Sequence, residues 1–235
     1  MALPQLNSAT YELELPSSGE VVEFRPFLVK EQKILMMAQE SEDAKQVETA
    51  FANIIKACTF DKIDAYKLPL FDIEYIFLKL RSKSVGEEVE IMVPIPDTEE
   101  TVPVKVNLDK IDVLQNEDHT NEIALTDDIK LIMSYPTLKD MHRFGGEEEN
   151  ETEATFDLIK SCIYEIHDGD EIHHKIDISN KELGDFIDSM STDNLESIGV
   201  FFSTMPSLTH MIKVKNPKTK KNVEVELSGL QSFFG

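Results

Sequence analysis

One short segment holds most of the residues whose types and spacing could do chemistry. His167, Asp168, Asp170, His173 and His174 lie within eight residues, and imidazole and carboxylate groups are common ligands of transition metals. The Asp-Gly pair in this segment is typical of a turn, and adjacent histidines in an extended chain point to opposite faces. The spacing therefore favours a solvent-facing turn, with a metal-dependent enzyme that uses these five residues as the alternative.

No other segment has the spacing of a known catalytic motif. The sequence contains no Gly-rich phosphate loop, no G-x-S-x-G elbow and no H-E-x-x-H helix. Two segments, 95–98 and 216–219, have the form of a zinc-ribbon knuckle, but neither contains the cysteines that would bind zinc. Cys58 and Cys162 lie in apolar helical contexts typical of buried thiols in a reducing compartment. We therefore expect no enzyme activity, no cofactor and no bound metal.

The composition indicates an acidic, soluble chain that contacts neither nucleic acid nor membranes. The 235 residues include 45 Asp and Glu and 23 Lys and Arg, for a formal net charge of −22. Such a charge repels nucleic acids and anionic membrane surfaces. The first residues lack the basic and apolar regions of a signal peptide, and no apolar run approaches the roughly 20 residues that span a bilayer. We expect a soluble protein that is not exported.

The N-terminal part is predicted to form a hairpin followed by two helices. Apolar and polar residues alternate over 11–15 and 20–24, and the Pro-Ser-Ser-Gly segment between them is typical of a turn. Good helix formers occupy 29–38, and a second helical pattern covers 47–58. The first helix is expected to pack its apolar face on the hairpin. The residues expected to form that face are Val29, Ile34, Met37 and Ala38.

A helix and a hairpin form the centre of the chain, and the hairpin is repeated near the C-terminus. Apolar residues recur at helical spacing over 72–80, and strands are predicted at 88–93 and 102–106. The segment 211–227 shares with this hairpin the pattern P-x-T-x-x-x-V-x-V. The matching positions are Pro96, Thr98, Val102 and Val104 in the first copy and Pro217, Thr219, Val223 and Val225 in the second.

The region between the two hairpins is predicted to be mainly helical. Residues 115–122 are predicted to be a loop, and 129–135 a strand. Helices are expected at 137–143, 154–166, 179–190 and 194–204. The two glycines that open 145–153 precede five carboxylates, which is the strongest break in the chain. It separates 1–144 from 154–235, either as two domains or as parts of one.

The two tips of the repeated hairpin carry opposite charges. The first tip holds Asp97, Glu99 and Glu100, at the positions that lysines fill in the second. The lysines of the second tip are Lys213, Lys215, Lys218, Lys220 and Lys221. This predicts docking of tip to tip or of tip to partner, and the alternative is that charge merely keeps two solvated hairpin ends soluble.

The segment after the second hairpin is apolar. Leu230, Phe233 and Phe234 together would make an adhesive surface if they were exposed. They are therefore expected either to pack against the rest of the chain or to bind a partner.

Several long stretches resemble one viral family. They are MALPQLNSATYELELPSSGE, FRPFLVKEQKILMMAQES, FDIEYIFLKLRSKSVGE, DHTNEIALTDDIKLIMSYPTLKDM, FFSTMPSLTH and LSGLQSFFG. Together they resemble the baseplate hub subunit of T-even-type contractile-tailed bacteriophages (myoviruses). The resemblance implies a non-enzymatic protein that binds other hub or tail proteins, either as a virion subunit in the tail baseplate or as an assembly chaperone in the host cytoplasm. It gives no catalytic residue to carry over.

The predicted fold class is α+β. Antiparallel hairpins are expected at the N-terminus, the centre and the C-terminus, packed with about six helices.

Overall fold

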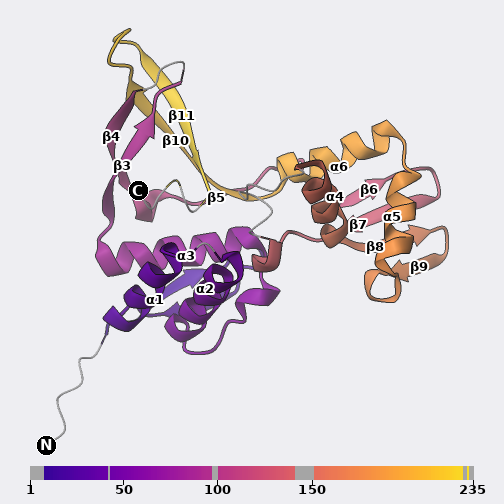
Figure 1. Ribbon diagram of the computed structural model, residues 1–235, viewed down its shortest axis with the longest axis horizontal. Helices are drawn as coiled ribbons and strands as arrows, with labels where there is room; N and C mark the ends of the chain where they lie inside the picture. The colour runs from indigo at the N-terminus through magenta and orange to yellow at the C-terminus, as the bar shows by residue number, and fades with distance from the viewer. Residues whose placement is uncertain (1–7, 42, 97–99, 141–150, 230–231, 233–235) are drawn as a thin grey trace, which may run out of the picture. The chain divides into compact units, whose positions relative to one another are not determined.

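The described part of the chain forms two compact units. The computed structural model describes residues 8–41, 43–96, 100–140, 151–229 and 232. Unit 1 consists of Met1–Leu114 and Ser207–Gly235, and unit 2 of Gln115–Pro206. Six α-helices and several antiparallel sheets occur in the described residues (Figure 1), which confirms the predicted α+β class.

All three predicted hairpins are present, as β1–β2, β3–β4 and β10–β11. Unit 1 contains β1 (Tyr11–Glu14), β2 (Val21–Phe24), α1 (Val29–Gln39), α2 (Ala44–Cys58), α3 (Leu70–Val85), β3 (Glu88–Pro94), β4 (Thr101–Asn107), β5 (Val113–Leu114), β10 (Ser207–Lys215), β11 (Asn222–Ser228) and the 3-10 helices Ala65–Lys67 and Leu108–Lys110. Unit 2 contains β6 (Glu122–Ala124), β7 (Ile129–Met133), α4 (Glu151–Cys162), β8 (Ile163–Asp168), β9 (Glu171–His174), α5 (Asn180–Asp188), α6 (Thr192–Thr204) and the 3-10 helix Lys175–Asp177.

The N-terminal hairpin is held to α3 by a buried carboxylate. Alternation along β1 and β2 turns Leu13, Val22 and Phe24 inward, and all three side chains are buried. The turn between the strands donates two hydrogen bonds to Asp72 in the first turn of α3, one from the backbone N–H of Ser17 at 3.1 Å and one from its hydroxyl. A polar group within the buried helix thus fixes where the hairpin lies.

The apolar face predicted for α1 is wrong, except at Ala38. Val29 and Met37 are about 70% exposed, at 69% and 71%, whereas Glu31 is only 2% exposed. Glu31 accepts hydrogen bonds from the backbone N–H of Leu28 at 2.8 Å and from Arg25 Nη2 at 2.9 Å. This carboxylate turns its side of α1 inward, and the predicted apolar residues therefore face outward.

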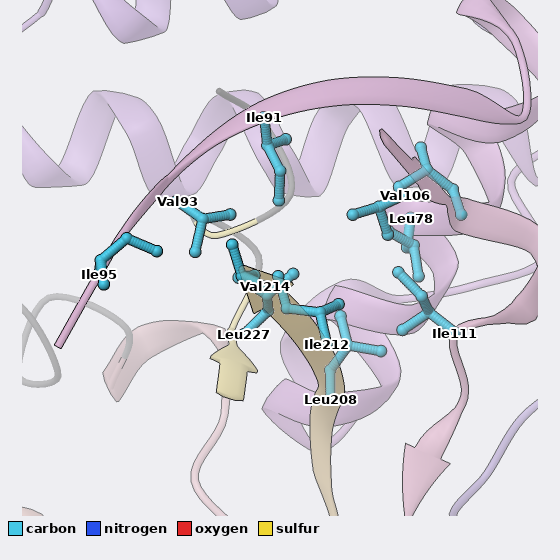
Figure 2. Packing of buried hydrophobic residues seen from close by; sticks show 11 residues of the cluster. Leu78, Ile91, Val93, Ile95, Val106, Ile111, Leu208, Ile212, Val214 and Leu227 are labelled. Carbon is cyan, nitrogen blue, oxygen red and sulfur yellow. The ribbon is translucent and has the colours of Figure 1, made fainter. Parts of the chain in front are cut away.

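The two copies of the repeated hairpin share one hydrophobic core. Figure 2 shows their inward side chains converging with residues from α3 and from the segment after β4. The buried members are Leu78, Ile91, Val93, Ile95, Val106, Leu108, Ile111, Leu208, Ile212, Val214 and Leu227. Because inward side chains of all four strands enter or pack against this core, the hairpins pack face to face rather than extending separately into solvent. We call this pair of hairpins, β3–β4 and β10–β11, the arm.

Unit 2 is a four-stranded antiparallel sheet with the order β6-β7-β8-β9, packed with three helices. Its core contains inward residues of the sheet and the apolar faces of α4, α5 and α6. The predicted capping box at Ser179 is present and begins α5. Cys162 is buried in this core, and Cys58 is buried in unit 1, as their apolar contexts predicted.

The helix predicted at 154–166 is too long at its C-terminal end. α4 stops at Cys162, and Ile163–Asp168 is strand β8, which pairs with β7 on one side and β9 on the other. Cross-strand pairing there overrides the helical spacing of the apolar residues. Strand β6 was not predicted, because only three residues form it.

Two further predictions fall partly outside the described residues. In the helix predicted at 137–143, residues 138–140 form a 3-10 turn, and Asp140 Oδ2 accepts hydrogen bonds from the backbone and hydroxyl of Thr137, both at 3.0 Å. The break predicted at 145–153 falls inside unit 2. Because 141–150 are not described, the division into 1–144 and 154–235 stays a prediction.

Candidate interaction surfaces

The sequence repeat in the arm is a repeat in structure. Ile91 pairs with Val104 in the first hairpin, and the corresponding Ile212 pairs with Val225 in the second. All four side chains belong to the shared core or pack against it. The two hairpins therefore have the same register and the same inward face, as the repeated sequence pattern predicted.

The tips of the arm close in the same way. The backbone N–H of Ile95 donates to the carbonyl of Glu100, and that of Asn216 donates to the carbonyl of Lys221, both at 2.9 Å. Asn216 is buried, and its side-chain oxygen accepts hydrogen bonds at 2.9 Å from the backbone N–H groups two and three residues later. These bonds fix the basic tip as an ordered turn and hold its lysines at defined positions.

The charges of the two tips meet within the chain. Lys218 Nζ lies 3.3 Å from Glu100 Oε1, so at least one pair of the predicted opposite charges is joined. Lys213 pairs with Glu224 across β10–β11, also at 3.3 Å. The remaining lysines of the basic tip make no ion pair within the described part of the chain, and they are Lys215, Lys220 and Lys221. These three are exposed and available to an external partner.

Five of the predicted contact residues lie outside the described residues. They are Asp97 and Glu99 at the acidic tip, and Leu230, Phe233 and Phe234 in the C-terminal segment. Their part in a contact surface stays a prediction from the sequence.

The base of the arm is fixed to α3 by partly buried charged groups. Lys79 Nζ donates hydrogen bonds to the carbonyls of Asp109 and Ile111, both at 3.0 Å. Ser82 and Lys83 of the same helix contact the Asp109 carboxylate. Burial lowers the pKa of Lys79, an effect that the nearby carboxylates oppose only in part. The 3-10 helix after β4 is thereby held against α3, which orients the first hairpin.

The histidines of the 167–174 segment lie on both faces of a hairpin. β8 and β9 are joined through Gly169, whose φ of +57° is the left-handed conformation that suits glycine in a tight turn. His174 pairs with Glu165 across the strands and His173 with Ile166, so the two adjacent histidines point to opposite faces, as predicted.

Glu165 engages the two histidines on its own face. His167 Nε2 lies 2.9 Å from one carboxylate oxygen and His174 Nδ1 lies 3.0 Å from the other. The hydrogen bond from His167 is the main reason that the pKa of Glu165 lies below its ordinary value. No group of three or more His, Cys, Asp or Glu among the described residues is arranged to hold a metal ion. The geometry is that of a polar cluster on a sheet face, in which Glu165 contacts one histidine of its own strand and one of the neighbouring strand.

Comparison with known proteins identifies the family. A family model described as T4 bacteriophage base plate protein matches residues 8–235. The chain belongs to this family. No curated protein and no solved structure matched the chain. Membership confirms the predicted resemblance at the level of a bacteriophage baseplate protein, and it indicates a structural or assembly role among baseplate proteins in the virion tail.

Among the described residues of this baseplate protein, no helix is both long and apolar enough to cross a membrane.

One exposed surface was missed by reasoning from the sequence. The outward side of α1 carries Val29, Met36 and Met37, which were counted toward the core or passed over. The signal that could have found it is Glu31, which lies three residues after the N-cap and six after Arg25. In this chain the capping glutamate and its pairing with Arg25 lie on the inward side of α1.

Proposed function

We propose that the chain acts in the baseplate hub by binding other hub or tail proteins, without catalysis. Family membership carries this proposal, because a baseplate is an assembly of proteins in contact with one another. Placement of the chain in the hub, rather than elsewhere in the baseplate, rests on the resemblance of the stretches quoted above, which cover most of the chain. The absence of a recognised catalytic motif in the sequence supports a binding role.

The arm is the proposed contact element. Its two hairpins share a core, and Lys79 of α3 donates hydrogen bonds to the segment at its base, so the tip is held in place relative to α3. The basic tip is exceptional on a chain of net charge −22. Lys218 already pairs with Glu100. Lys215, Lys220 and Lys221 make no ion pair within the described chain, and they favour a partner with an acidic surface. The C-terminal Leu230, Phe233 and Phe234 are proposed as an adjoining apolar contact.

Co-purification of hub proteins with the tagged chain tests the proposed tip. The test variant is Lys220→Glu with Lys221→Glu, and the matched control is Lys110→Glu with Lys181→Glu, which reverses two exposed charges elsewhere. Juxtaposed like charges cost several kcal/mol at an interface, so recovery of hub proteins should fall at least about tenfold for the tip variant alone. In a further variant, the C-terminal apolar residues are also replaced by serine. If recovery of hub proteins is unchanged in both variants, neither the arm nor the C-terminal segment is a contact surface.

A second version of the role is an assembly chaperone that holds hub subunits in the host cytoplasm and leaves before the virion is complete. Quantitative mass spectrometry of purified particles separates the two. A fixed copy number per particle supports a hub subunit, and absence from particles with presence in hub intermediates supports a chaperone.

A further inference from the structure

The outward face of α1 is an apolar row that no described residue covers. Val29, Met36 and Met37 lie at spacings of seven and eight residues, which places them on one side of a helix. Their exposed fractions are 69%, 54% and 71%. We call these three residues the α1 ridge. Full burial of side chains of this size stabilises a contact by about 1.5–3 kcal/mol each, so the ridge is a strong potential binding surface.

The rotation of α1 that exposes this ridge is fixed rather than incidental. Glu31 is bonded to Arg25 and to the backbone N–H of Leu28, and Leu35 and Ala38 on the same side are buried. Turning the ridge inward would expose those apolar residues and would break a buried ion pair, which costs several kcal/mol. The ridge is therefore presented to solvent by the packing of unit 1.

Two lysines lie beside the ridge, and the exposed Glu40 lies on the same side of α1, one turn after Met36. Lys33 lies on the outward side between Val29 and Met37, and it makes no ion pair within the described chain. Lys30 is exposed beside it, and its Nζ lies 3.4 Å from Oε1 of the buried Glu31. Both lie on a chain with twice as many acidic as basic residues. A partner that covers the ridge should therefore offer apolar surface with carboxylates opposite Lys30 and Lys33.

A second copy of this chain does not meet that requirement. In a two-fold symmetric contact the same residues face one another. The ridge is centred on Lys33, so antiparallel pairing that covers all three ridge residues on both copies would bring two ammonium groups together at the centre of the contact, with Glu40 beyond the end of the ridge. The charge pattern favours a different protein.

We propose that α1 inserts its Val29–Met36–Met37 ridge into an apolar groove, rimmed by Asp or Glu, on another baseplate protein. The geometry is that of an amphipathic helix in a groove, and methionine suits it because its flexible side chain adapts to the shape of an apolar pocket. That the partner is a baseplate protein rests on the function proposed above, whereas the apolar and acidic character of the groove rests on α1 itself.

Site-specific photo-crosslinking in infected cells tests this contact with the full-length chain. A benzophenone amino acid replaces Met37, and the crosslinked peptides are identified by mass spectrometry. The same amino acid at Val200, which is 58% exposed on α6, is the matched control, and at Lys220 it reports on the arm. We expect Met37 to crosslink to a baseplate protein at a segment containing apolar and acidic residues. Lys33→Glu should lower that yield at least about tenfold, and Lys181→Glu should not.

Other outcomes would overturn the inference in distinct ways. Crosslinks from Met37 only to a second copy, or none where Lys220 gives crosslinks to baseplate proteins, would reject the ridge and leave the proposed function standing. A yield unaffected by Lys33→Glu would reject the acidic rim. If neither position crosslinked to any baseplate protein, the proposed function would fail as well. Urea unfolding of each variant checks that folding is unchanged.

Discussion

Unit 1 contains two buried carboxylates, Glu31 and Asp72, whose surroundings shift their pKa values in opposite directions. Burial alone would raise the pKa of Glu31, but hydrogen bonds from Arg25 and Leu28 outweigh it, so that the pKa of Glu31 lies below its ordinary value. At Asp72 burial dominates over the two hydrogen bonds from Ser17, and the pKa is raised. The two carboxylates are therefore expected to change the free energy of unfolding with pH in opposite directions.

Replacement of Glu31 by glutamine leaves Arg25 without its carboxylate partner. Removing one member of a buried ion pair costs about 3–5 kcal/mol of unfolding free energy, and we expect Glu31→Gln to fall in this range at neutral pH. Because the pKa of Glu31 is lowered by folding, its contribution is present above the unfolded-state pKa and is lost as pH falls through the folded-state value. The difference between the two proteins in urea unfolding should therefore shrink in acid.

The exposed pair Lys62–Glu23 is the control for this measurement. Both side chains are about half exposed, so Lys62→Met should cost no more than about 1 kcal/mol. The double variant Arg25→Met with Glu31→Leu should recover most of the loss caused by Glu31→Gln, because no buried charge is left unpaired. Equal costs for Glu31→Gln and Lys62→Met would contradict the structural role of Glu31.

Asp72 predicts the opposite pH dependence. Its raised pKa means that its contribution is present below the unfolded-state pKa and is lost as pH rises through the folded-state value. Asp72→Asn keeps an acceptor for Ser17 and removes the charge, so its unfolding free energy relative to the native protein should increase with pH. Asp72→Ala removes the acceptor and should cost about 1–2 kcal/mol. A pH-independent difference between the native protein and Asp72→Asn would show that burial does not control this group.

Among the single elements, the sequence predicted which strands pair in hairpins better than it predicted which face of a helix is buried or where a helix ends. The repeated P-x-T-x-x-x-V-x-V pattern correctly predicted two hairpins of one design, because alternation and turn residues are local signals. The inward side of α1 depends on an ion pair with Arg25 of the preceding segment, and apolar periodicity does not report such a pair. The end of α4 depends on strands β7 and β9, which pair with the residues that follow Cys162.

The arm predicts energetic coupling between its two hairpins. Ile91→Ala and Ile212→Ala each truncate a buried side chain in the shared core and should cost about 2–5 kcal/mol. Because both truncations open space in one cluster, the double variant should depart from additivity by at least about 0.5 kcal/mol. Urea unfolding of the two single variants and the double variant measures this coupling. Strict additivity would indicate that the two hairpins are independent.

At the scale of the whole chain, unit 2 is an insertion into unit 1. Leu114 at the end of β5 and Ser207 at the start of β10 are direct antiparallel partners, and unit 2 is the chain between them. The sequence did not reveal this boundary, because β5 has only two residues and its partner is far along the chain. The predicted break at 145–153 has a stronger local signal, two glycines and a run of carboxylates, and remains untested.

Each unit should therefore fold without the other. Residues 115–206 contain their own core and should give a soluble fragment with one cooperative unfolding transition, measured by circular dichroism. Joining Leu114 to Ser207 through Asn-Gly should convert β5 and β10 into a hairpin and leave unit 1 folded. Failure of the joined protein to fold, while full-length chain folds, would show that unit 1 needs unit 2.

A role for this chain among baseplate proteins requires that the chain be present in their assemblies. Hub intermediates and finished particles are purified from infected cells, and the chain is quantified by mass spectrometry against known baseplate proteins. We expect a fixed ratio of this chain to a hub protein in at least one of the two preparations. Absence from both preparations, with the chain expressed and folded in the same cells, would contradict it.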